Sequence, residues 1–434
     1  MNTAIESFGR YPKLSHEKVE YLNWISDEPD FNDNSLKYLP YGLGKSYGDS
    51  CLNPNGALIK MQNLNRFISF DSDNGILRVE SGVTLEQCIN FLLPRGWFLP
   101  VTPGTKLITV GGAVANDVHG KNHHVAGTFG CHVSKFELLR SDLTRTTCSH
   151  YENSDLFAAT IGGLGLTGII TWVEFRCIRC DGPMIHCENI KYRSFEDFFY
   201  INNDSADFDF TVAWVDTNSA GSGIYSRGNF AAAEFQIDPS KFKSKMLPFP
   251  FDYDFINPLT VYIFNKLYYS KQFNDFESSI IHYNPFFYPL DAVDGWNKAY
   301  GKKGFLQYQF VLPHEAGLNS LKNIFKTITK SGNSSFLTVL KTFGNIKSHG
   351  MMSFPKPGIT MAIDFKMLGS STLAMLDEAD IIVRDCGGVL YPAKDARMSG
   401  ENFRLFYPQW EEFSKFIDPK FSSGFWQRVT GDKL

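Results

Sequence analysis

Short apolar runs alternate with polar or glycine-rich joints through the first 180 residues. Residues 67–70 and 76–80 predict two strands around Asp73-Asn74-Gly75, a strong signal for the turn of a hairpin. Thr84-Leu85-Glu86-Gln87 has the spacing of a capping box and predicts a helix that runs to about Leu93. Short strands and helices without a regular βαβ period predict an α+β fold.

From about residue 183 the pattern changes, because glycine becomes rarer and longer strand-like runs appear. A glycine-rich stretch, 158–168, and a strand expected over 169–177 come just before this change. Beyond it, the clearest predicted strands are 208–215, 304–311 and 360–365, and the clearest helices are 313–332 and 371–386. Residues 244–284 show only weak periodicity, and we expect them to be partly mobile.

This organisation predicts that the chain has three parts. Residues 1–183 form the N-terminal part of one domain, and residues 184–388 form a second domain built on an antiparallel sheet. Residues 389–434 return to pack on the first domain. A chain of 434 residues is too long for one ordinary core, which agrees with this division.

The composition is that of a globular protein of modest charge. Hydrophobic residues make up 43% of the sequence and charged residues 20%. The formal net charge of −4 gives no basic field of the kind that draws a protein to nucleic acid. The 39 phenylalanines predict a bulky core, and some of the rings are candidates for an apolar substrate groove or a membrane-facing patch.

No stretch of the sequence predicts a secretory signal or a membrane span. Residues 246–269 are the most aromatic segment, but acidic residues and prolines interrupt it, so it is suited to lie on a membrane rather than to cross one. We therefore expect a cytoplasmic protein, with peripheral contact at the inner face of the plasma membrane as a further option.

The eight cysteines are expected to stay reduced, since no secretory signal is seen. Cys177 and Cys180 have the CxxC spacing and Cys187 follows, so a zinc site would need His186 as its fourth ligand. Their context alternates like a strand rather than forming a zinc knuckle. Structural thiols without a metal are therefore the favoured interpretation.

The segment Tyr41–Asp49 combines three glycines with a lysine and hydroxyl side chains. The glycines leave backbone N–H groups free to form a concave anion site, and Lys45, Ser46 and Tyr47 add charge and hydrogen-bond donors. The segment matches neither a P-loop nor the Rossmann fingerprint. A pyrophosphate suits it, and an ordinary glycine turn is the alternative.

The second glycine-rich site is Thr109–Asn116, with Pro103-Gly104 just before it. Gly111 and Gly112 open a run of small residues, which lets a short helix approach a flat or phosphorylated ligand closely. Two such sites suggest one extended, phosphate-bearing cofactor. Two ordinary tight turns are the alternative.

Histidines follow directly in the segment His119–His124, HGKNHH. His119 stands where the second glycine site ends, which favours proton transfer or substrate contact. A structural role and a metal site formed by His119 and His123 are the alternatives. Near the C-terminus, Lys394 is a candidate for stabilising negative charge on a cofactor ring, or else an ordinary loop lysine.

These four elements, in this order, resemble the FAD-dependent oxidoreductases of the vanillyl-alcohol-oxidase superfamily. Within it, the chain is similar to the decaprenylphosphoryl-β-D-ribose 2′-oxidase family. The matching segments span nearly the whole chain and are YGLGKSYGDS, TVGGAVANDVHGKNHHVAGTFGCHV, DLFAATIGGLGLTGII, NPLTVYIFNKLYYSK, FFYPLDAVDGWNKAYGKKGFLQYQFVLP, SSFLTVLKTFG, MMSFPKPG and LYPAKDAR. The segments VHGKNHH and GFLQYQFV are long and specific.

The resemblance implies a two-domain fold of the vanillyl-alcohol-oxidase type. Its FAD-binding domain is discontinuous, and the middle domain covers the flavin with an antiparallel sheet. The implied FAD contacts are Tyr41, Gly42, Gly44, Lys45, Ser46, Tyr47, Gly48, Gly104, Thr109, Val110, Gly111, Gly112, Asn116, His119, Ile169 and Tyr391. Related enzymes with covalent FAD often carry a histidine at about the place of Lys45, so we expect non-covalent FAD here.

The resemblance also implies a substrate. The 2′-hydroxyl of a polyprenyl-phosphate pentose is oxidised to a ketone, hydride passes to flavin N5, and a partner NAD(P)-dependent ketoreductase completes an epimerisation. Hydride leaves a carbinol carbon only as the hydroxyl proton is withdrawn, so His119 and Tyr47 are candidate bases, while Lys394 would stabilise the reduced flavin. The implied substrate positions are Lys121, Gln307, Gln309, Lys341, Phe343, Thr360 and Ala362, with Lys341 facing the phosphate and Phe343 near the sugar.

One position departs from the family pattern. Several members carry a cysteine where this chain has Ala362, with Thr360 two residues earlier, so inhibitors that attack that thiol should not act here. Two other functions stay open. One is a flavin oxidase or dehydrogenase of a soluble sugar or aldonolactone, and the other is a non-catalytic protein that binds a metal or a membrane.

Overall fold

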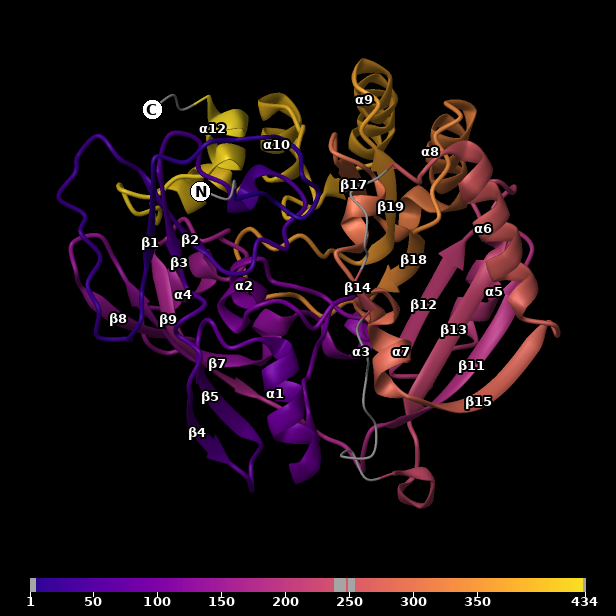
Figure 1. Ribbon diagram of the computed structural model, residues 1–434. Helices are drawn as coiled ribbons and strands as arrows, with labels where there is room; N and C mark the ends of the chain where they lie inside the picture. Colours follow the sequence, from indigo (N-terminus) through magenta and orange to yellow (C-terminus); the bar gives the residue numbers. More distant parts are fainter. Residues whose placement is uncertain (1–4, 238–246, 249–253, 432–434) are drawn as a thin grey trace.

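The computed structural model describes residues 5–237, 247–248 and 254–431 (Figure 1). Its N-terminal half contains a five-stranded antiparallel sheet in the order β4-β5-β9-β7-β8 and a three-stranded parallel sheet in the order β1-β3-β2. These strands are β1 Lys18–Tyr21, β2 Tyr38–Tyr41, β3 Ala57–Lys60, β4 Phe67–Asp71, β5 Ile76–Glu80, β7 Val133–Leu139, β8 Arg145–Ser149 and β9 Ile169–Arg176.

An eight-stranded antiparallel sheet dominates the right side of Figure 1, in the order β15-β11-β13-β12-β18-β19-β17-β20. Its strands are β11 Met184–Tyr192, β12 Phe210–Val215, β13 Gly223–Phe230, β15 Phe276–His282, β17 Phe305–Leu312, β18 Thr338–Phe343, β19 Gly358–Lys366 and β20 Val389–Leu390. The chain therefore has the mixed α+β architecture that its pattern predicts, and β20 lies just past the boundary expected at residue 388.

Alternate side chains of the central strands face opposite sides of this sheet. Tyr308 and Phe310 of β17 share a hydrophobic core with helices α8 (Gly317–Lys330) and α9 (Ser370–Asp385). Gln307 and Gln309 consequently face the N-terminal half of the chain. The register pairs Gln307 with Asp364 and Gln309 with Ala362, so polar residues of β17 and β19 share this face.

The described residues form further α-helices besides α8 and α9. They are α1 Leu85–Leu92, α2 Val110–Ala115, α3 His123–Ala126, α4 Ser154–Thr160, α5 Phe195–Asn203, α6 Pro258–Lys271, α7 Tyr283–Phe287, α10 Gly400–Phe406, α11 Trp410–Ser414 and α12 Gly424–Thr430. Two short strand pairs complete the structure: β6 Trp97–Phe98 with β10 Ile178–Arg179, and β14 Leu247–Pro248 with β16 Val293–Asp294.

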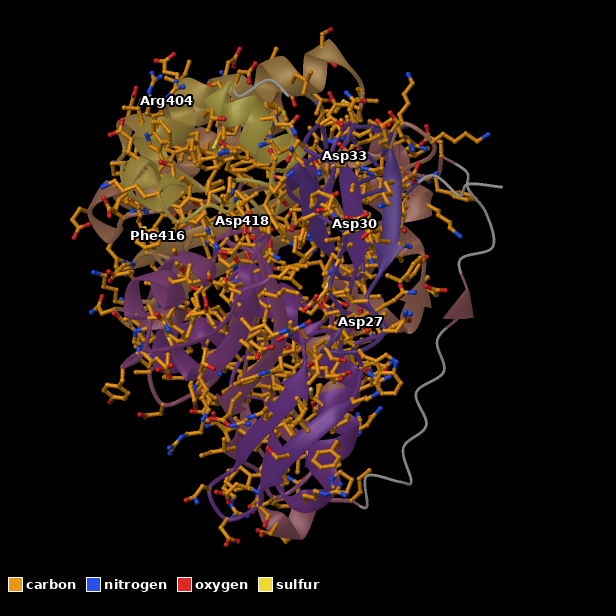
Figure 2. All side chains as sticks on the ribbon, turned by 90° about the vertical axis from the view of Figure 1, so that its left-hand side faces the viewer. Asp27, Asp30, Asp33, Arg404, Phe416 and Asp418 are labelled. Atoms are coloured by element: carbon orange, nitrogen blue, oxygen red, sulfur yellow. The ribbon has the colours of Figure 1, made fainter. Side chains whose placement is uncertain are left out.

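The C-terminal residues pack back on the N-terminal half. Tyr38 N–H donates to the carbonyl of Lys420 at 2.7 Å, and α12 packs against the 3-10 turn at Asp49–Cys51. Asp418 accepts hydrogen bonds from the backbone N–H of Ser141 at 2.8 Å and from its hydroxyl at 2.6 Å. Figure 2 shows Asp418 between the C-terminal helices above it and the strands below it.

Most of the elements predicted from local patterns are present. The hairpin forms as β4 and β5, and Thr84 and Gln87 make both hydrogen bonds of the capping box at the start of α1. The strand expected over 169–177 is β9. The helix expected over 313–332 begins later, because a short 3-10 turn at His314–Ala316 precedes α8.

Residues 244–284, whose periodicity is weak, form regular elements over most of their described part. Asn257 caps a 14-residue helix, α6, and residues 276–282 form β15 at the edge of the large sheet. The helix was missed because apolar residues lie on its exposed side: Leu259 and Leu267 are 66% and 67% exposed. Residues 244–246 and 249–253 of this segment lie outside the described residues.

Candidate active site

A large cavity lies between the N-terminal half and the eight-stranded sheet. Its volume is about 570 Å³. Residues 42–47 and most of 104–112 line it on one side, which we call the glycine wall. Residues of β17, β18 and β19 line it on the other, which we call the sheet wall. The two regions that the sequence singles out thus face each other.

The two segments of the glycine wall touch. A Cβ atom on Gly42 would lie 2.6 Å from Thr109 Oγ1, so a side chain at residue 42 would push the segments apart. Gly44 has a φ of +62°, and a Cβ there would lie 1.9 Å from the Tyr41 hydroxyl. Thr109 Oγ1 also accepts the N–H of Gly112 and caps the short helix α2. The glycines of this wall therefore bring backbone close to the cavity, beside the side chains of Lys45, Ser46 and Tyr47.

Unpaired hydroxyl groups also line the cavity. Ser50 Oγ and Ser81 Oγ are buried and have no hydrogen-bond partner among the described residues. Buried polar groups normally have one, so a ligand is the natural partner. Lys45 lies alongside, where burial lowers its pKa while Asp291 and Asp294 act in the opposite direction. Bare backbone, free hydroxyls and a lysine fit a large phosphate-bearing cofactor such as FAD.

Three further lysines line the cavity. Burial lowers the pKa of Lys121 to about 8. Burial, together with the charges of Lys121 and Lys394, lowers the pKa of Lys341 to about 7. Lys121 Nζ donates to the backbone carbonyl of Phe286, and Lys341 Nζ donates to that of Gly120. Both amines are bound to carbonyl groups and not to carboxylates, so an anionic ligand would stabilise their charged forms.

His119 projects from the end of the second glycine site to the sheet wall. Its Nε2 lies 3.0 Å from Nε2 of Gln309, and its Nδ1 lies 2.9 Å from Nζ of Lys341. Its ring packs against Phe343 with 4.8 Å between the ring centres. Burial and the neighbouring lysines hold the pKa of His119 well below its usual value, so the ring is neutral and able to accept a proton.

Tyr47 and Lys394 meet at the other end of the polar region. Lys394 Nζ lies 3.8 Å from the centre of the Tyr47 ring. Burial raises the pKa of Tyr47 well above its usual value, so the phenol keeps its proton. Tyr391, from the same C-terminal segment as Lys394, donates its hydroxyl proton to the carbonyl of Asn116 at 2.7 Å. The C-terminal segment thus completes a site begun by the N-terminal one.

Asp364 is a buried residue next to this site that sequence reasoning missed. Gln307 donates to it at 2.6 Å, and burial raises its pKa, while burial also lowers the pKa of nearby Lys394. The signal was present: Thr360, Ala362 and Asp364 alternate along one strand and must share one face. Only the first two were recognised as pocket positions.

The structure brings most of the predicted site residues to the cavity. Those lining it are Gly42, Gly44, Lys45, Ser46, Tyr47, Gly104, Thr109, Gly111, Gly112, Asn116, His119, Lys121, Gln307, Gln309, Lys341, Thr360, Ala362, Tyr391 and Lys394. The others lie behind its walls. Phe343 packs between His119 and His123, Gly48 packs on Asp395, and Tyr41, Val110 and Ile169 are core residues.

His124, His132 and the CxxC pair take part in other contacts. His124 and His132 contact the backbone carbonyls of Phe208 and Ala126. Cys177 and Cys180 are buried thiols beside β9 and β10. In the described ranges, no three histidine, cysteine or acidic side chains are arranged to hold a metal ion.

The cavity extends from the polar end along the face of the sheet. This extension is mainly apolar and is lined by Val212, Trp214, Ile224, Tyr268, Ile281, Leu337 and Val339. Cys187 and Asn189 of β11 also line it. The cavity therefore has a charged end beside the glycine wall and an apolar end that reaches α6.

Comparison with known proteins supports a flavin site. The family model described as an FAD binding domain matches residues 30–149, which include both glycine sites. Together with the α+β fold, this defines the class: the chain is a FAD-dependent oxidoreductase of the vanillyl-alcohol-oxidase type.

The match to one relative extends far beyond that domain. The chain is 37% identical over 396 residues to the decaprenylphosphoryl-β-D-ribose oxidase of Mycolicibacterium smegmatis, covering 87% of this chain and 85% of that protein. It belongs to the decaprenylphosphoryl-β-D-ribose oxidase family.

Two other relatives match about 30% of the chain or less. Human Δ(24)-sterol reductase is 35% identical over 118 residues, which is 27% of this chain and 23% of that protein. Mouse L-gulonolactone oxidase is 29% identical over 133 residues, or 30% and 29% of the two chains. These partial matches bear on the shared flavoprotein class rather than on the substrate.

Proposed function

We propose that the protein oxidises the 2′-hydroxyl of a polyprenyl-phosphate-linked pentose to a ketone, with two electrons passing to FAD. The shape and chemistry of the cavity carry this proposal. Lysines at one end suit a phosphate and a sugar, and the apolar extension along the sheet suits the first units of a lipid chain. The name of the Mycolicibacterium smegmatis relative describes a substrate with these same three parts.

The residues take distinct roles in this proposal. The neutral ring of His119 accepts the hydroxyl proton as hydride leaves the carbon. With FAD bound, Lys394 would supply positive charge beside its ring, and Tyr47, which keeps its proton, would donate a hydrogen bond. Lys121 and Lys341 face the sugar phosphate, while Gln307 and Gln309 position the sugar.

We propose that the glycine wall holds FAD without a covalent bond, because Lys45 stands at the place where a linking residue would be needed. In this proposal, residues 1–183 and 389–434 form the FAD-binding domain, and residues 184–388 form the substrate domain. All strands of the large sheet except β20 belong to the second domain, and the C-terminal return that carries β20 packs on the first. The prediction is yellow protein from which denaturation alone releases FAD, while flavin that stays attached after denaturation would contradict it.

Anaerobic flavin bleaching tests the proposed reaction directly. FAD-loaded protein is mixed with farnesylphosphoryl-β-D-ribose, with the arabinose epimer, and with free ribose and aldonolactones. We expect bleaching by the lipid-linked ribose. His119→Ala and Lys394→Ala should keep FAD but slow bleaching by about 100-fold or more. Lys303→Ala, at an exposed lysine, is the control and should leave the rate unchanged.

The same panel decides between this function and the second candidate. A flavin oxidase of soluble sugars or aldonolactones would be bleached by the free compounds and not by the lipid-linked ribose. The long apolar part of the cavity argues for the lipid, since a small polar substrate leaves it unfilled.

We also propose that the protein works at the inner face of the plasma membrane, where a lipid-linked substrate resides. The residue Tyr268 of α6 lines the cavity, and Leu259, Ile263 and Leu267 of α6 are exposed. No helix in the described ranges joins the length and apolarity that spanning a bilayer demands. Flotation with liposomes should recover the protein, and Leu259→Ser/Leu267→Ser should reduce recovery; equal recovery would remove α6 from the proposal.

The ketone product requires a second enzyme if the sugar is to be epimerised. We propose an NAD(P)-dependent ketoreductase as the partner, acting on the opposite face of the new carbonyl. Adding such a reductase and NAD(P)H to the reaction should convert the ribose form to the arabinose form. If the reaction yields only the ribose form, the proposal of this partner is contradicted.

A further inference from the structure

The hydrogen bonds around His119 define which of its ring nitrogens carries the proton. The chain of hydrogen bonds that decides this begins at Thr360. The Thr360 hydroxyl donates to the backbone carbonyl of Phe310 at 2.7 Å. Its oxygen is therefore an acceptor toward Gln309, whose Nε2 lies 3.2 Å away. The amino group of the Gln309 side chain, rather than its carbonyl, must point to this place.

The same amino group has a second hydrogen, and it points to His119. Gln309 Nε2 lies 3.0 Å from His119 Nε2. Because Gln309 is the donor in this contact, His119 Nε2 must be the acceptor and carries no proton. A neutral imidazole has one N–H group, so the proton of His119 is on Nδ1.

The proton on Nδ1 decides the state of Lys341. Nδ1 lies 2.9 Å from Lys341 Nζ. An N–H group that donates to an amine needs the lone pair of that amine, which an ammonium group does not have. Lys341 is thus a neutral amine that accepts from His119 and donates to the Gly120 carbonyl at 3.0 Å.

The surroundings favour the same state. The titratable or charged groups that face Lys341 are His119 and Lys121 from the loop, His123 from α3 and Lys394 from the C-terminal segment. None of these is an acid that would stabilise an ammonium. Burial and the two lysines accordingly lower the pKa of Lys341 to about 7.

We propose that the hydroxyl proton of the substrate does not stay on His119 but is relayed to Lys341, and that Thr360 acts through Gln309 to position this relay. The inference rests on the proposed function. The substrate hydroxyl replaces the Gln309 amide as the hydrogen-bond donor to His119 Nε2. The O–H bond then breaks and its proton goes to Nε2, while the Nδ1 proton moves to the lone pair of Lys341. The C–H electron pair leaves as hydride to FAD, and the carbonyl forms.

The relay solves an electrostatic problem. A protonated His119 would be a buried cation beside Lys341 and Lys394, which is why its pKa lies well below the usual value. Lys341 accepts a proton far more readily, because its pKa is about 7. The final positive charge then lies where the substrate phosphate can face it.

The tautomer of His119 is the first test, and it needs no substrate. Nitrogen-15 NMR of histidine-labelled, FAD-loaded protein at pH 8 should show Nδ1 protonated and Nε2 bare. Thr360→Val removes the acceptor that orients Gln309, so the Nε2–H form should appear, while Thr360→Ser should keep the original form. A bare Nδ1 in the unmodified protein would overturn the proposal.

Thr338→Val is the matched control. Thr338 lies on the neighbouring strand β18, is buried, and its hydroxyl has no hydrogen-bond partner among the described residues. The same chemical change there should leave the His119 tautomer as it is. A shift of the tautomer in this control would show that any loss of a hydroxyl from the sheet disturbs His119, which would also overturn the role of Thr360.

The pH dependence of flavin bleaching tests the relay itself. The rate at saturating farnesylphosphoryl-β-D-ribose should fall about tenfold per pH unit below pH 7, because a protonated Lys341 cannot accept. Lys341→Met should slow bleaching and move the midpoint of this acid limb to lower pH, since the group that sets it is gone, although Asp364, Lys394 and Lys121 still titrate in the site. If Lys341 only binds phosphate, the variant instead raises KM and leaves the limb in place, which overturns the relay.

The two hypotheses fail in different ways. If no lipid-linked sugar bleaches the flavin, the proposed function fails while the NMR tautomer still reports on the hydrogen-bond chain. If bleaching occurs but its acid limb is the same in Lys341→Met as in the unmodified protein, the proposed function stands and the relay is contradicted.

Discussion

The two walls face the same cavity but differ in the groups that they present to a ligand. The glycine wall presents backbone, and its contacts are so close that a Cβ on Gly42 would meet Thr109 at 2.6 Å. The sheet wall presents polar side chains, among them Gln309, Lys341 and Thr360. The first wall is therefore sensitive to added volume, and the second is sensitive to charge and proton position.

This difference separates the two tasks of a flavoenzyme. A large cofactor that stays bound needs a complementary shape, and fixed backbone supplies it at no cost in side-chain entropy. A reaction that moves a proton needs groups whose pKa values are tuned by burial and neighbours. Mutations in the glycine wall should accordingly change the shape of the cofactor site, and mutations in the sheet wall should change the pH dependence of the reaction.

The largest effect is expected from added volume behind the glycine wall. In Gly48→Ala the new Cβ would lie 1.8 Å from the backbone oxygen of Asp395, which cannot rotate away. We expect the variant to misfold or to lose FAD, measured as the flavin-to-protein ratio and by thermal unfolding. A yellow variant of normal stability would contradict the role assigned to close backbone contact.

Gly104→Ala is the paired variant for this prediction. A Cβ on Gly104 would have no protein atom within 4 Å, and the residue faces the cavity. The apoprotein should therefore unfold at an unchanged temperature, while FAD binds about tenfold more weakly because of the added methyl group. Together the two variants separate glycine needed for folding from glycine needed for the ligand.

An intermediate effect is expected at Arg428, which ties the N-terminal loop to the segment that carries Lys394. Its Nη2 lies 2.8 Å from Oδ1 of Asp49 and 2.9 Å from Oδ2 of Asp395. Arg428→Met leaves two buried carboxylates without their partner, so unfolding in urea should show a loss of about 3–5 kcal/mol. Flavin bleaching should slow as well, since Lys394 adjoins Asp395.

Arg193→Met is the control for that loss. Arg193 pairs with Asp275 at 3.3 Å, but both side chains are more than 70% exposed. Removing this exposed pair should change the free energy of unfolding by less than about 1 kcal/mol. Equal losses in the two variants would show that burial does not explain the importance of Arg428.

The smallest effect concerns acid stability and arises at His123 of α3, which packs behind the sheet wall. His123 packs on Phe343, its two ring nitrogens have no hydrogen-bond partner among the described residues, and burial with nearby Lys341 lowers its pKa to about 3. Because folding lowers the pKa of His123 from 6.5 to about 3, His123 contributes to the free energy of unfolding at pH values above 6.5. This contribution is lost as the pH falls from 6.5 towards 3.

His123→Leu should remove that part of the acid sensitivity. Between pH 6.5 and pH 5 the loss in free energy of unfolding should shrink by about 2 kcal/mol relative to the unmodified protein, measured by urea unfolding at both pH values. His314→Leu, at an exposed histidine, should leave the pH dependence unchanged. An unaltered pH dependence in His123→Leu would place the acid sensitivity elsewhere.

Several features of the fold were predictable because their signals are local. The capping box at Thr84 and the turn at Asp73–Gly75 are satisfied within a few residues, so distant contacts do not change them. The helix α6 was missed for the opposite reason. Its apolar residues face outward, so the periodicity that marks a buried helix face is absent.

The sequence by itself determined the chemistry available: two glycine sites, a histidine between them and the sheet, lysines, and the family to which their order belongs. Only the tertiary structure decided which of these groups meet. Lys341 and His119 are 222 residues apart in sequence yet form one hydrogen bond, and Asp364 joins the site only because β17 and β19 are in register. Residue types follow from the chain alone, whereas pKa values and proton positions depend on burial and neighbours that exist only once the walls close.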